Sequence, residues 1–312
     1  MTITYNNSTI HTASSAESFT LPTNGKVMAS DLVFTLEGSL GLQVSYGNSE
    51  IINTQSAGTH TLPCSGKIMS GDITGTLVSS GPPPAPVDWA TDSWATIQAV
   101  SVAGKTAQTY GSQVGATRQI TLTDNTTMTI RLSNADDTMY TLSDNSRTSG
   151  LCMEFVDCFP TTAQMNTSNT NAGGWNACAM RTVTMAQLYD LLPSDLKDVL
   201  ATVNIKAANG GSGTISVVDS ADKLFLLAEK EVFGTRTYSV TAEADALTQW
   251  KWYQDHNTNA DRVKKRNGSA SYWWLRSPRS GYSYYFCIVF SSGSAGRSDA
   301  FTGYGVSPGF VI

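Results

Sequence analysis

The chain has 312 residues, of which 14% are charged, and it carries a net charge of −5. This length allows two domains, or one large domain with a small appendage. The low charge and the many Ser, Thr, Asn and Gly residues are more typical of β-rich extracellular or virion proteins than of helical cytosolic enzymes. The negative balance argues against nucleic-acid binding, which needs a basic surface. No apolar stretch reaches the roughly 20 residues of a membrane span, and the N-terminus lacks the basic and apolar regions of a secretory signal, so we expect no membrane insertion and no signal peptide.

The first eighty residues contain a repeat with a period of 41. ITYNNSTI (3–10) corresponds to VSYGNSEI (44–51), and LPTNGKVMASDLVFTL (21–36) corresponds to LPCSGKIMSGDITGTL (62–77), with 16 of 37 aligned residues identical. Both copies alternate apolar and polar residues around an Asn-Gly or Ser-Gly turn, which predicts half-buried β-strands. A unit this small needs to stack on its neighbour or on another chain. The copies resemble short β modules in tail and surface proteins of bacteriophages that infect Gram-positive gut bacteria.

A proline-rich spacer, GPPPAP (81–86), follows the repeats. Three consecutive prolines favour an extended polyproline conformation, which predicts a domain boundary. We therefore expect one β repeat over 1–40, a second over 41–80, a linker over 81–88 and a large domain over 89–312.

The large domain is predicted to mix strands and helices. QITLTDNTTMTIRLSN (119–134) predicts a hairpin that turns at Asp124-Asn125, and LCMEFVDCF (151–159) predicts a buried strand. Helical segments are predicted at 184–203 (capped by Thr184 and restarted at Pro193), 223–234 and 246–256.

Patterns that carry catalysis or hold metals are missing from the sequence. None of the three histidines lies at ligand spacing from a cysteine, a carboxylate or another histidine. NGGSG (209–213) lacks the context of a phosphate-binding loop, and the pairs at 136–137 and 144–145 lack the ligand ladder of a calcium loop. The five cysteines form no CxxC pair and are interpreted as free thiols. We therefore expect no catalytic residue, no metal and no cofactor.

Two segments need an interpretation of their own. GGWNACAMR (173–181) places Trp175 and Arg181 where they could form a sugar pocket; alternatively, Trp175 fills the core and Arg181 satisfies buried carbonyls. The basic run RVKKR (262–266) is interpreted as a solvated loop rather than a phosphate contact.

The C-terminal segment 272–312 contrasts two rigid ends, WWLRSP and GVSPGFVI, with a centre rich in Tyr, Ser and Gly. We expect the two ends to pair in one sheet, with FCIVF (286–290) as a central strand and SSGSAGRSDA (291–300) as a loop. Tyr provides contact area at low entropic cost while Ser and Gly adapt, so the composition is that of an antibody paratope. From 279 to 305 there is no Lys, Glu, Gln, Met or Trp, and none of these five is encoded by a codon ending in C or T. An AAC or AAT codon with randomised adenines yields the residues that are present.

Residues 119–312 resemble a C-type-lectin-fold domain, related to formylglycine-generating enzymes and to the phage major tropism determinant, that occurs in the variable proteins of diversity-generating retroelements. The motifs that carry the resemblance are GGWNACAMR, KLFLLAEKEVFG, YWWLRSP and YGVSPGFVI. The resemblance implies an α+β fold class, with the C-type lectin fold domain preceded by two small all-β repeats, and a variable region at about 272–312. It also implies that adenine-directed mutagenesis rewrites this region while the scaffold holds it as a ligand-binding face.

The resemblance assigns roles within 272–312. The framework it implies is Trp273, Trp274, Leu275, Arg276, Ser277, Pro278, Gly305, Val306, Pro308 and Phe310. The ligand-binding residues it implies are Arg279, Tyr282, Tyr284, Tyr285, Ile288, Phe290, Arg297, Asp299, Phe301 and Tyr304. The related enzymes need a cysteine pair near the C-terminus, and only Cys287 lies there.

The expected function is that of a non-enzymatic, diversified receptor-binding adhesin of a phage tail or fibre, located on the virion or on a cell surface. Its expected partners are a bacterial surface protein or glycan, and other virion proteins through the N-terminal repeats; a homotrimer is also compatible with the sequence. Two alternatives stay open: an enzyme of the formylglycine-generating or cell-wall-active type, and a purely structural virion protein.

Overall fold

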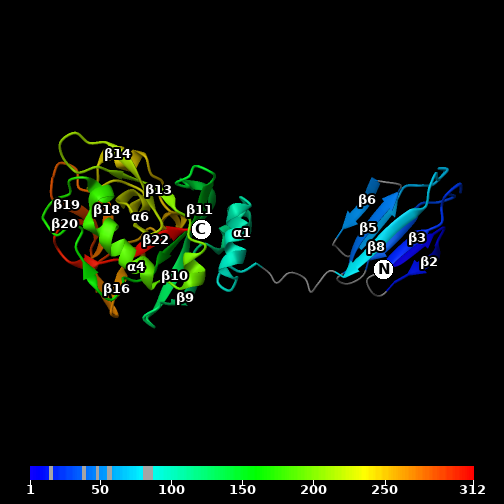
Figure 1. Ribbon diagram of the computed structural model, residues 1–312, viewed down its shortest axis with the longest axis horizontal. Coiled ribbons are helices and arrows are strands. Elements are labelled where there is room, and N and C mark those ends of the chain that lie inside the picture. Colours follow the sequence, from blue (N-terminus) through cyan, green and yellow to red (C-terminus); the bar gives the residue numbers. More distant parts are fainter. Residues whose placement is uncertain (14–16, 37–39, 47–48, 55–57, 80–86) are drawn as a thin grey trace. The chain divides into compact units, whose positions relative to one another are not determined.

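The computed structural model describes residues 1–13, 17–36, 40–46, 49–54, 58–79 and 87–312. Two units, 1–86 and 87–312, each have their own core and are drawn in Figure 1. Most of the expected proline-rich linker, residues 81–86, lies outside the described residues.

The N-terminal unit is built from two four-stranded sheets that the repeats share. The sheet orders are β2-β1-β4-β7 and β3-β8-β5-β6. The third strand of each repeat joins the sheet of the other repeat: β7 pairs with β4, and β3 pairs with β8. The two repeats therefore form one unit by exchanging strands. The strands are β1 (Thr2–Tyr5), β2 (Ser8–Thr12), β3 (Glu17–Leu21), β4 (Leu32–Leu36), β5 (Leu40–Tyr46), β6 (Ser49–Thr54), β7 (Gly58–Leu62) and β8 (Ile73–Ser79).

The 41-residue period reappears in the hydrogen bonds as an approximate twofold symmetry. The amide of Gly25 donates to the carbonyl of Met69, and the amide of Gly66 donates to the carbonyl of Met28, both at 2.7 Å. Both glycines have positive φ, as the predicted turns require. Val27 pairs with its own repeat equivalent, Ile68, in an isolated bridge. The pseudo-twofold axis therefore passes between these two side chains.

The C-terminal unit contains two five-stranded sheets, ordered β15-β22-β11-β10-β9 and β12-β21-β18-β19-β20, and two separate hairpins, β13-β14 and β16-β17. Apolar side chains from both large sheets and the short helices form a single core. The strands are β9 (Thr117–Thr121), β10 (Thr127–Thr141), β11 (Thr148–Phe155), β12 (Thr162–Ala163), β13 (Val203–Ala208), β14 (Val217–Asp222), β15 (Phe225–Leu226), β16 (Lys264–Arg266), β17 (Ser269–Ser271), β18 (Trp273–Pro278), β19 (Tyr285–Val289), β20 (Ala295–Asp299), β21 (Tyr304–Gly305) and β22 (Pro308–Val311).

The helices of this unit are short. They are α1 (Trp94–Val102), α2 (Thr106–Tyr110), α3 (Gly174–Ala177), α4 (Met185–Leu191), α5 (Ser194–Lys197), α6 (Glu229–Phe233), α7 (Thr241–Asp245) and α8 (Lys251–Asp255), with 3-10 turns at Gly111–Gln113 and Ala260–Arg262 and a π turn at Met180–Thr184.

The expected α+β C-type lectin fold is wrong. The structure is mostly β, with 41% strand and 19% helix distributed around many small sheets. The predicted helix at 184–203 is divided into α4 and α5, and its end becomes strand β13. Thr184 makes no capping bond because it continues a π turn into α4. The predicted helix at 246–256 is reduced to α8.

Two strand predictions are confirmed. The hairpin at 119–134 is β9 and β10, and Asn125 at its turn has a positive φ of 69°, which Asn tolerates better than most residues. The predicted buried strand at 151–159 is β11, which begins earlier and ends at Phe155, so that 156–159 lie beyond the strand; its residues Ser149–Phe155 are all buried.

The basic run at 262–266 is not a solvated loop. Lys264 is 2% exposed, and its ammonium lies 2.8 Å from Glu154 Oε2, with a further bond to the carbonyl of Phe155. Arg131 contacts the other oxygen of Glu154 at 2.7 Å, and the Tyr253 hydroxyl donates to Oε2. Burial alone raises the pKa of Glu154, but Lys264 and Arg131 outweigh it and hold the pKa at about 2. This buried ion cluster ties β10 and β11 to β16.

Candidate functional site

The candidate site is built on the sheet that contains β18, β19 and β20. Every residue of β18 is buried. The Trp273 indole donates to the carbonyl of Arg262, and the Trp274 indole donates to the carbonyl of Ala163. Arg276 is fully buried and forms two bonds, of 2.5 and 2.7 Å, to Glu231. The framework implied by WWLRSP is thus fixed by its side chains.

The two ends of the C-terminal segment do not pair with each other as expected. Residues Pro308–Val311 form β22, which pairs with β11 and β15 in the other five-stranded sheet. Only Gly305 of β21 pairs with β18, at Trp273. The segment therefore crosses from one sheet to the other, and all residues from Gly305 to Ile312 are buried.

The expected loop at 291–300 contains strand β20, which pairs with β19 in continuous antiparallel register. A tight turn precedes it, where Gly293 has a φ of 84°. Because β20 is the last strand in the sheet order, it forms an edge of the sheet.

The loop that joins β18 to β19 is held by bonds from distant parts of the chain. Asn171 is 1% exposed, and its amide group donates to the carbonyls of Tyr282 and Tyr285, both at 2.8 Å. The backbone amide of Asn171 donates to the carbonyl of Ser283, and Gly281 donates to the carbonyl of Gly211. These bonds end on backbone atoms of the loop, so its path is fixed whichever side chains it carries.

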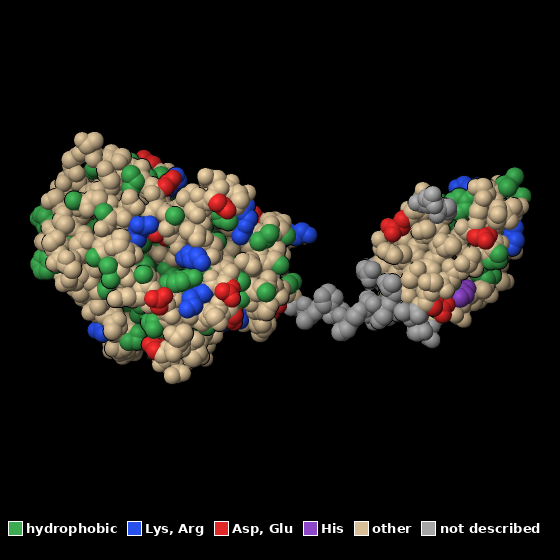
Figure 2. All heavy atoms as spheres, in the orientation of Figure 1, with side chains coloured by type: hydrophobic (Ala, Val, Ile, Leu, Met, Phe, Trp, Pro, Cys, Tyr) green, Lys and Arg blue, Asp and Glu red, His purple; other side chains and the backbone are tan. Residues whose placement is uncertain are grey.

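The outward side chains of this region form a cluster that we call the arginine–tyrosine face: Tyr238, Arg279, Tyr282, Tyr284, Tyr285 and Arg297. The Arg279 guanidinium lies 3.7 Å from the centre of the Tyr282 ring. The rings of Tyr284 and Tyr285 are 4.3 Å apart. Arg279 and Arg297 lie 5.8 and 5.1 Å from the centre of the Tyr238 ring, which places one ring near both cations. Figure 2 shows hydrophobic side chains, tyrosine included, at the edge of the C-terminal unit where Figure 1 labels β19 and β20.

The other predicted contact residues lie beside this face or beneath it. The carboxylate of Asp299 accepts a 2.7 Å hydrogen bond from the side-chain amide of Asn169. Phe301 is 46% exposed. The ring of Tyr304 lies between Tyr272 and Trp274. Phe290 is half-buried, with its ring over Gly296, where a Cβ would come within 2.6 Å of it.

Ile288 does not belong to the surface, because it is 1% exposed and part of the core. Its prediction as a ligand contact is therefore wrong: it lies on β19 between the buried residues Cys287 and Val289, in an interior strand of the sheet.

Three residues of the site were missed because they lie far from the C-terminal segment in the sequence. Tyr238 lies in the segment between α6 and α7, while Asn169 and Asn171 precede α3. The sequence contains one signal for Asn169 and Asn171: the segment TSNTNAGG is rich in asparagine, whose side chain can form hydrogen bonds with backbone groups of a loop.

GGWNACAMR forms part of the core rather than a sugar pocket. Trp175 is fully buried, and its indole donates to Asp222 at 2.9 Å. Arg181 pairs with the same carboxylate at 2.7 Å and donates to the carbonyls of Asn176 and Ala221. The second of the two interpretations is therefore correct for Trp175, whereas Arg181 pairs with a carboxylate and reaches carbonyls of exposed residues rather than buried ones.

The cysteines are free thiols, as predicted, and all five are buried. Burial raises the pKa of the Cys287 thiol well above its usual value, with Glu229 and Glu243 adding to the effect. Cys287 is thus uncharged and inaccessible, which is the opposite of what a nucleophile needs.

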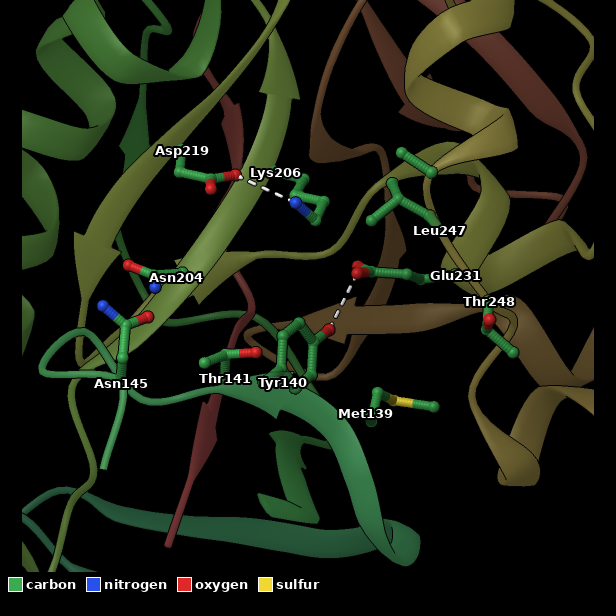
Figure 3. A pocket seen from close by; sticks show the side chains of 11 residues that line it. Met139, Tyr140, Thr141, Asn145, Asn204, Lys206, Asp219, Glu231, Leu247 and Thr248 are labelled. Carbon is green, nitrogen blue, oxygen red and sulfur yellow. Dashed lines mark hydrogen bonds and ion pairs between the residues drawn. The ribbon is translucent and has the colours of Figure 1, made fainter. Parts of the chain in front are cut away.

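A cavity of about 220 Å³ lies elsewhere in the C-terminal unit, between β10, β13, β14 and the segment after α7 (Figure 3). Its inner wall contains Glu231, which accepts bonds from Tyr140 and from Arg276. At its rim Lys206 and Asp219 form a 3.4 Å ion pair and are half exposed. Burial raises the pKa of Tyr140 well above its usual value. The ionisable groups of this cavity are thus already paired with each other, and their role is structural.

The two acidic pairs bond to backbone amides near them: Asp136 lies at an irregularity within β10, and Asp144 lies in the turn that follows it. Asp136 accepts the amides of Thr138 and Met139, and Asp144 accepts the amide of Ser146. Within the described residues there is no group of three or more metal-ligating side chains. No helix in the described ranges has the length and apolar character needed to cross a membrane.

Residues 137–312 match a family described as a domain of unknown function (DUF6273). The match covers more than half of the chain, so the chain belongs to this family. It includes the whole sheet that carries the arginine–tyrosine face and leaves out the N-terminal unit. No curated protein and no solved structure matches the chain.

Proposed function

We propose that this protein is a diversified ligand-binding protein, the target of a diversity-generating retroelement. Its arginine–tyrosine face engages a molecule on a bacterial surface, and the protein acts as a receptor-binding adhesin of a phage tail or fibre. In this proposal the residues that vary are those of the loop 279–285 and of β20.

One observation carries the proposal: the backbone of the proposed variable loop is fixed by residues that lie outside it. The bonds that Asn171 and Gly211 make to the loop all end on its carbonyl and amide groups. A surface that must accept many sequences needs this separation, because preorganised backbone leaves side chains free to change without an ordering cost. The absence of Lys, Glu, Gln, Met and Trp from 279–305 supports the same reading.

The N-terminal unit supports attachment to a particle. Among the described residues of this unit, the exposed large apolar side chains form two pairs 41 residues apart, Ile10 with Ile51 and Val27 with Ile68. They line two equivalent hollows of about 350 and 170 Å³. Exposed apolar patches of this kind mark protein interaction sites. We assign this surface to contact with other virion proteins.

The binding proposal is tested with the full chain, fluorescently labelled, and a panel of intact bacterial cells measured by flow cytometry. We expect at least one strain to be labelled, and Tyr284→Ala combined with Tyr285→Ala to abolish labelling. The matched control is Tyr189→Ala, which removes a half-buried tyrosine of α4 and should leave labelling intact. Unchanged labelling by the Tyr284/Tyr285 double variant would refute the assigned face.

The diversification proposal is tested on DNA. A reverse-transcriptase gene near the coding sequence, and an imperfect repeat of the 3′ end that differs at adenines, are the expected findings. A genomic neighbourhood with neither would remove the retroelement from the proposal while leaving ligand binding intact.

A further inference from the structure

We propose that the ligand is an acidic polypeptide, which adds as an extended strand to the free edge of β20 and places a carboxylate between Arg297 and Arg279. This inference rests on the proposed function, because it assigns a ligand class to the same face. It is carried by the open hydrogen-bonding edge of β20 and by two cations without an anionic partner.

The register of the β19–β20 ladder determines which backbone groups of β20 point outward. Phe290 donates its amide to the carbonyl of Ser294, and Ala300 donates its amide to the carbonyl of Tyr284. In an antiparallel ladder, bonded and non-bonded pairs alternate, so Phe286/Ser298 and Ile288/Gly296 are the bonded pairs. The amides and carbonyls of Ala295 and Arg297 therefore point away from β19.

No hydrogen bond from any described residue reaches these four outward groups. The neighbouring part of the edge is covered, because Thr302 donates to the carbonyl of Asp299 and Asn169 bonds Asp299 and Ala300. A short open stretch of two amides and two carbonyls remains. This is what strand addition by an extended peptide uses.

Two cations, Arg279 and Arg297, lie beside this stretch, with the carboxylate of Asp299 two residues from Arg297 on the same face of β20. No ion pair between described residues involves Arg279 or Arg297, and neither guanidinium donates a hydrogen bond within the described ranges. Both guanidinium groups lie near the Tyr238 ring, at 5.8 and 5.1 Å from its centre. Residues directly opposite each other on neighbouring strands have Cβ atoms within about 5.5 Å. An acidic residue of the added strand opposite Arg297 would therefore lie within reach of its guanidinium.

The arrangement favours a polypeptide over a glycan. A sugar ring stacks on an open aromatic face. One face of Tyr282 is covered by Arg279, the rings of Tyr284 and Tyr285 lie against each other, and the exposed ring of Phe301 lies beside the arginine–tyrosine face. The unpaired backbone groups of β20 match a peptide strand and have no counterpart in a polysaccharide.

The test measures fluorescence anisotropy of a labelled peptide of alternating Val and Glu, titrated with the full chain. A peptide of alternating Val and Lys is the charge control, and polysialic acid is the competing glycan probe. We expect the acidic peptide to bind, the basic one not to, and the affinity to fall with salt because exposed charges are screened.

Two single variants distinguish the contribution of the Arg297 charge from that of the open backbone edge of β20. Arg297→Gln should weaken binding about fivefold, while Lys105→Gln, an exposed residue beside α2, removes the same charge and should change nothing. Ala295→Pro removes one outward amide without touching the bonds to β19, since proline is tolerated at sheet edges and strand starts, and it should weaken binding by a similar factor. Tryptophan fluorescence confirms that each variant is folded.

Three outcomes would overturn the inference: no binding of the acidic peptide, equal binding of both peptides, or an affinity unchanged by Ala295→Pro. Saturable binding of polysialic acid that depends on Arg297, without peptide binding, would replace the polypeptide by an acidic glycan. If cell labelling depends on Tyr284 and Tyr285 but the acidic peptide does not bind, the acidic-polypeptide inference is refuted and the proposed function stands. If the cell labelling itself does not depend on these tyrosines, the proposed function falls.

Discussion

Strands β18 and β20 belong to the same sheet and to the same forty residues of sequence, yet different forces hold them. In β18 each side chain is buried, and Trp273, Trp274 and Arg276 bond to distant backbone or to Glu231. In β20, Arg297 is exposed and the strand is held by its backbone ladder with β19. The comparison teaches that this protein separates stability from recognition within one sheet. Substitutions in the first strand should act on folding, and substitutions around the second should act on binding.

The largest effect is expected from Arg276→Met. This change leaves Glu231 buried without its cation, which costs about 3–5 kcal/mol of unfolding free energy. Urea unfolding followed by tryptophan fluorescence measures it selectively, because all seven tryptophans lie in 87–312. Adding Glu231→Leu should recover part of the loss, since the uncompensated charge is then gone. A single variant as stable as the wild type would contradict a role of this pair in holding the framework.

A second prediction concerns pH. Glu243 is 1% exposed, and its burial raises its pKa to about 7 against the opposing effects of the Ala208 amide and Arg276. Between pH 4.5 and 7 the unfolded chain loses this proton before the folded chain does, so stability should fall as pH rises through this window, by up to about 3 kcal/mol. Glu154, with its pKa at about 2, acts only below this window.

The matching variant is Glu243→Gln, which keeps a carbonyl oxygen for the Ala208 amide. Its urea midpoint should change less between pH 5 and pH 8 than that of the wild type, and it should be the more stable protein at pH 8. Parallel curves for the two proteins would contradict the assignment of this dependence to Glu243.

An intermediate effect on stability is expected from Asn171→Ala, because Asn171 holds the loop that joins β18 to β19. The carbonyl of Tyr282 loses the Asn171 amide group as its donor, and the carbonyl of Tyr285 keeps only the amide of Arg279, at a cost of about 1–3 kcal/mol. Hydrogen exchange should show faster amide exchange in 280–285 and unchanged exchange in β18. Asn171→Asp, which has the same size but directs a buried carboxylate at the two carbonyls, should speed exchange at least as much; a loop that keeps its protection in both variants would show that its path has another cause.

The smallest effect on stability is expected where binding changes most. Replacing Tyr282 and Tyr284 together by Ser should lower the unfolding free energy by only about 1 kcal/mol per site, because these side chains contact Arg279 and one another on the surface and are not part of the core. A loss as large as that of Arg276→Met would abolish the distinction between the two strands.

The sequence allowed local features to be predicted better than the arrangement in space. The turn at Asn125 and the repeated turns at Gly25 and Gly66 follow from residues that tolerate positive φ. Strand β20 was missed because SSGSAGRSDA has neither apolar alternation nor β-branched residues; it is a strand because β19 provides a partner. Lys264 was taken for a surface residue because the carboxylate that buries it, Glu154, is 110 residues away.

The C-type lectin prediction failed for a related reason. The motifs on which it depended describe packing: Trp175 with Asp222, and Arg276 with Glu231. Such contacts define a core locally but do not specify which strands are neighbours. The placement of β22 in the other sheet shows the difference, since pairing partners distant in sequence leave no periodic signal.

The exchange of β3 and β7 in the N-terminal unit has a consequence for how such a unit arises. A chain with only one 41-residue copy could complete its sheets solely by taking the missing strand from a second molecule, so it would exist as a homodimer. Joining the two genes end to end turns that dimer into a single chain and removes its dependence on concentration. It also frees the halves to diverge, as Thr23 and its counterpart Cys64 have done. The pseudo-twofold axis between Val27 and Ile68 would correspond to the twofold axis of such a homodimer.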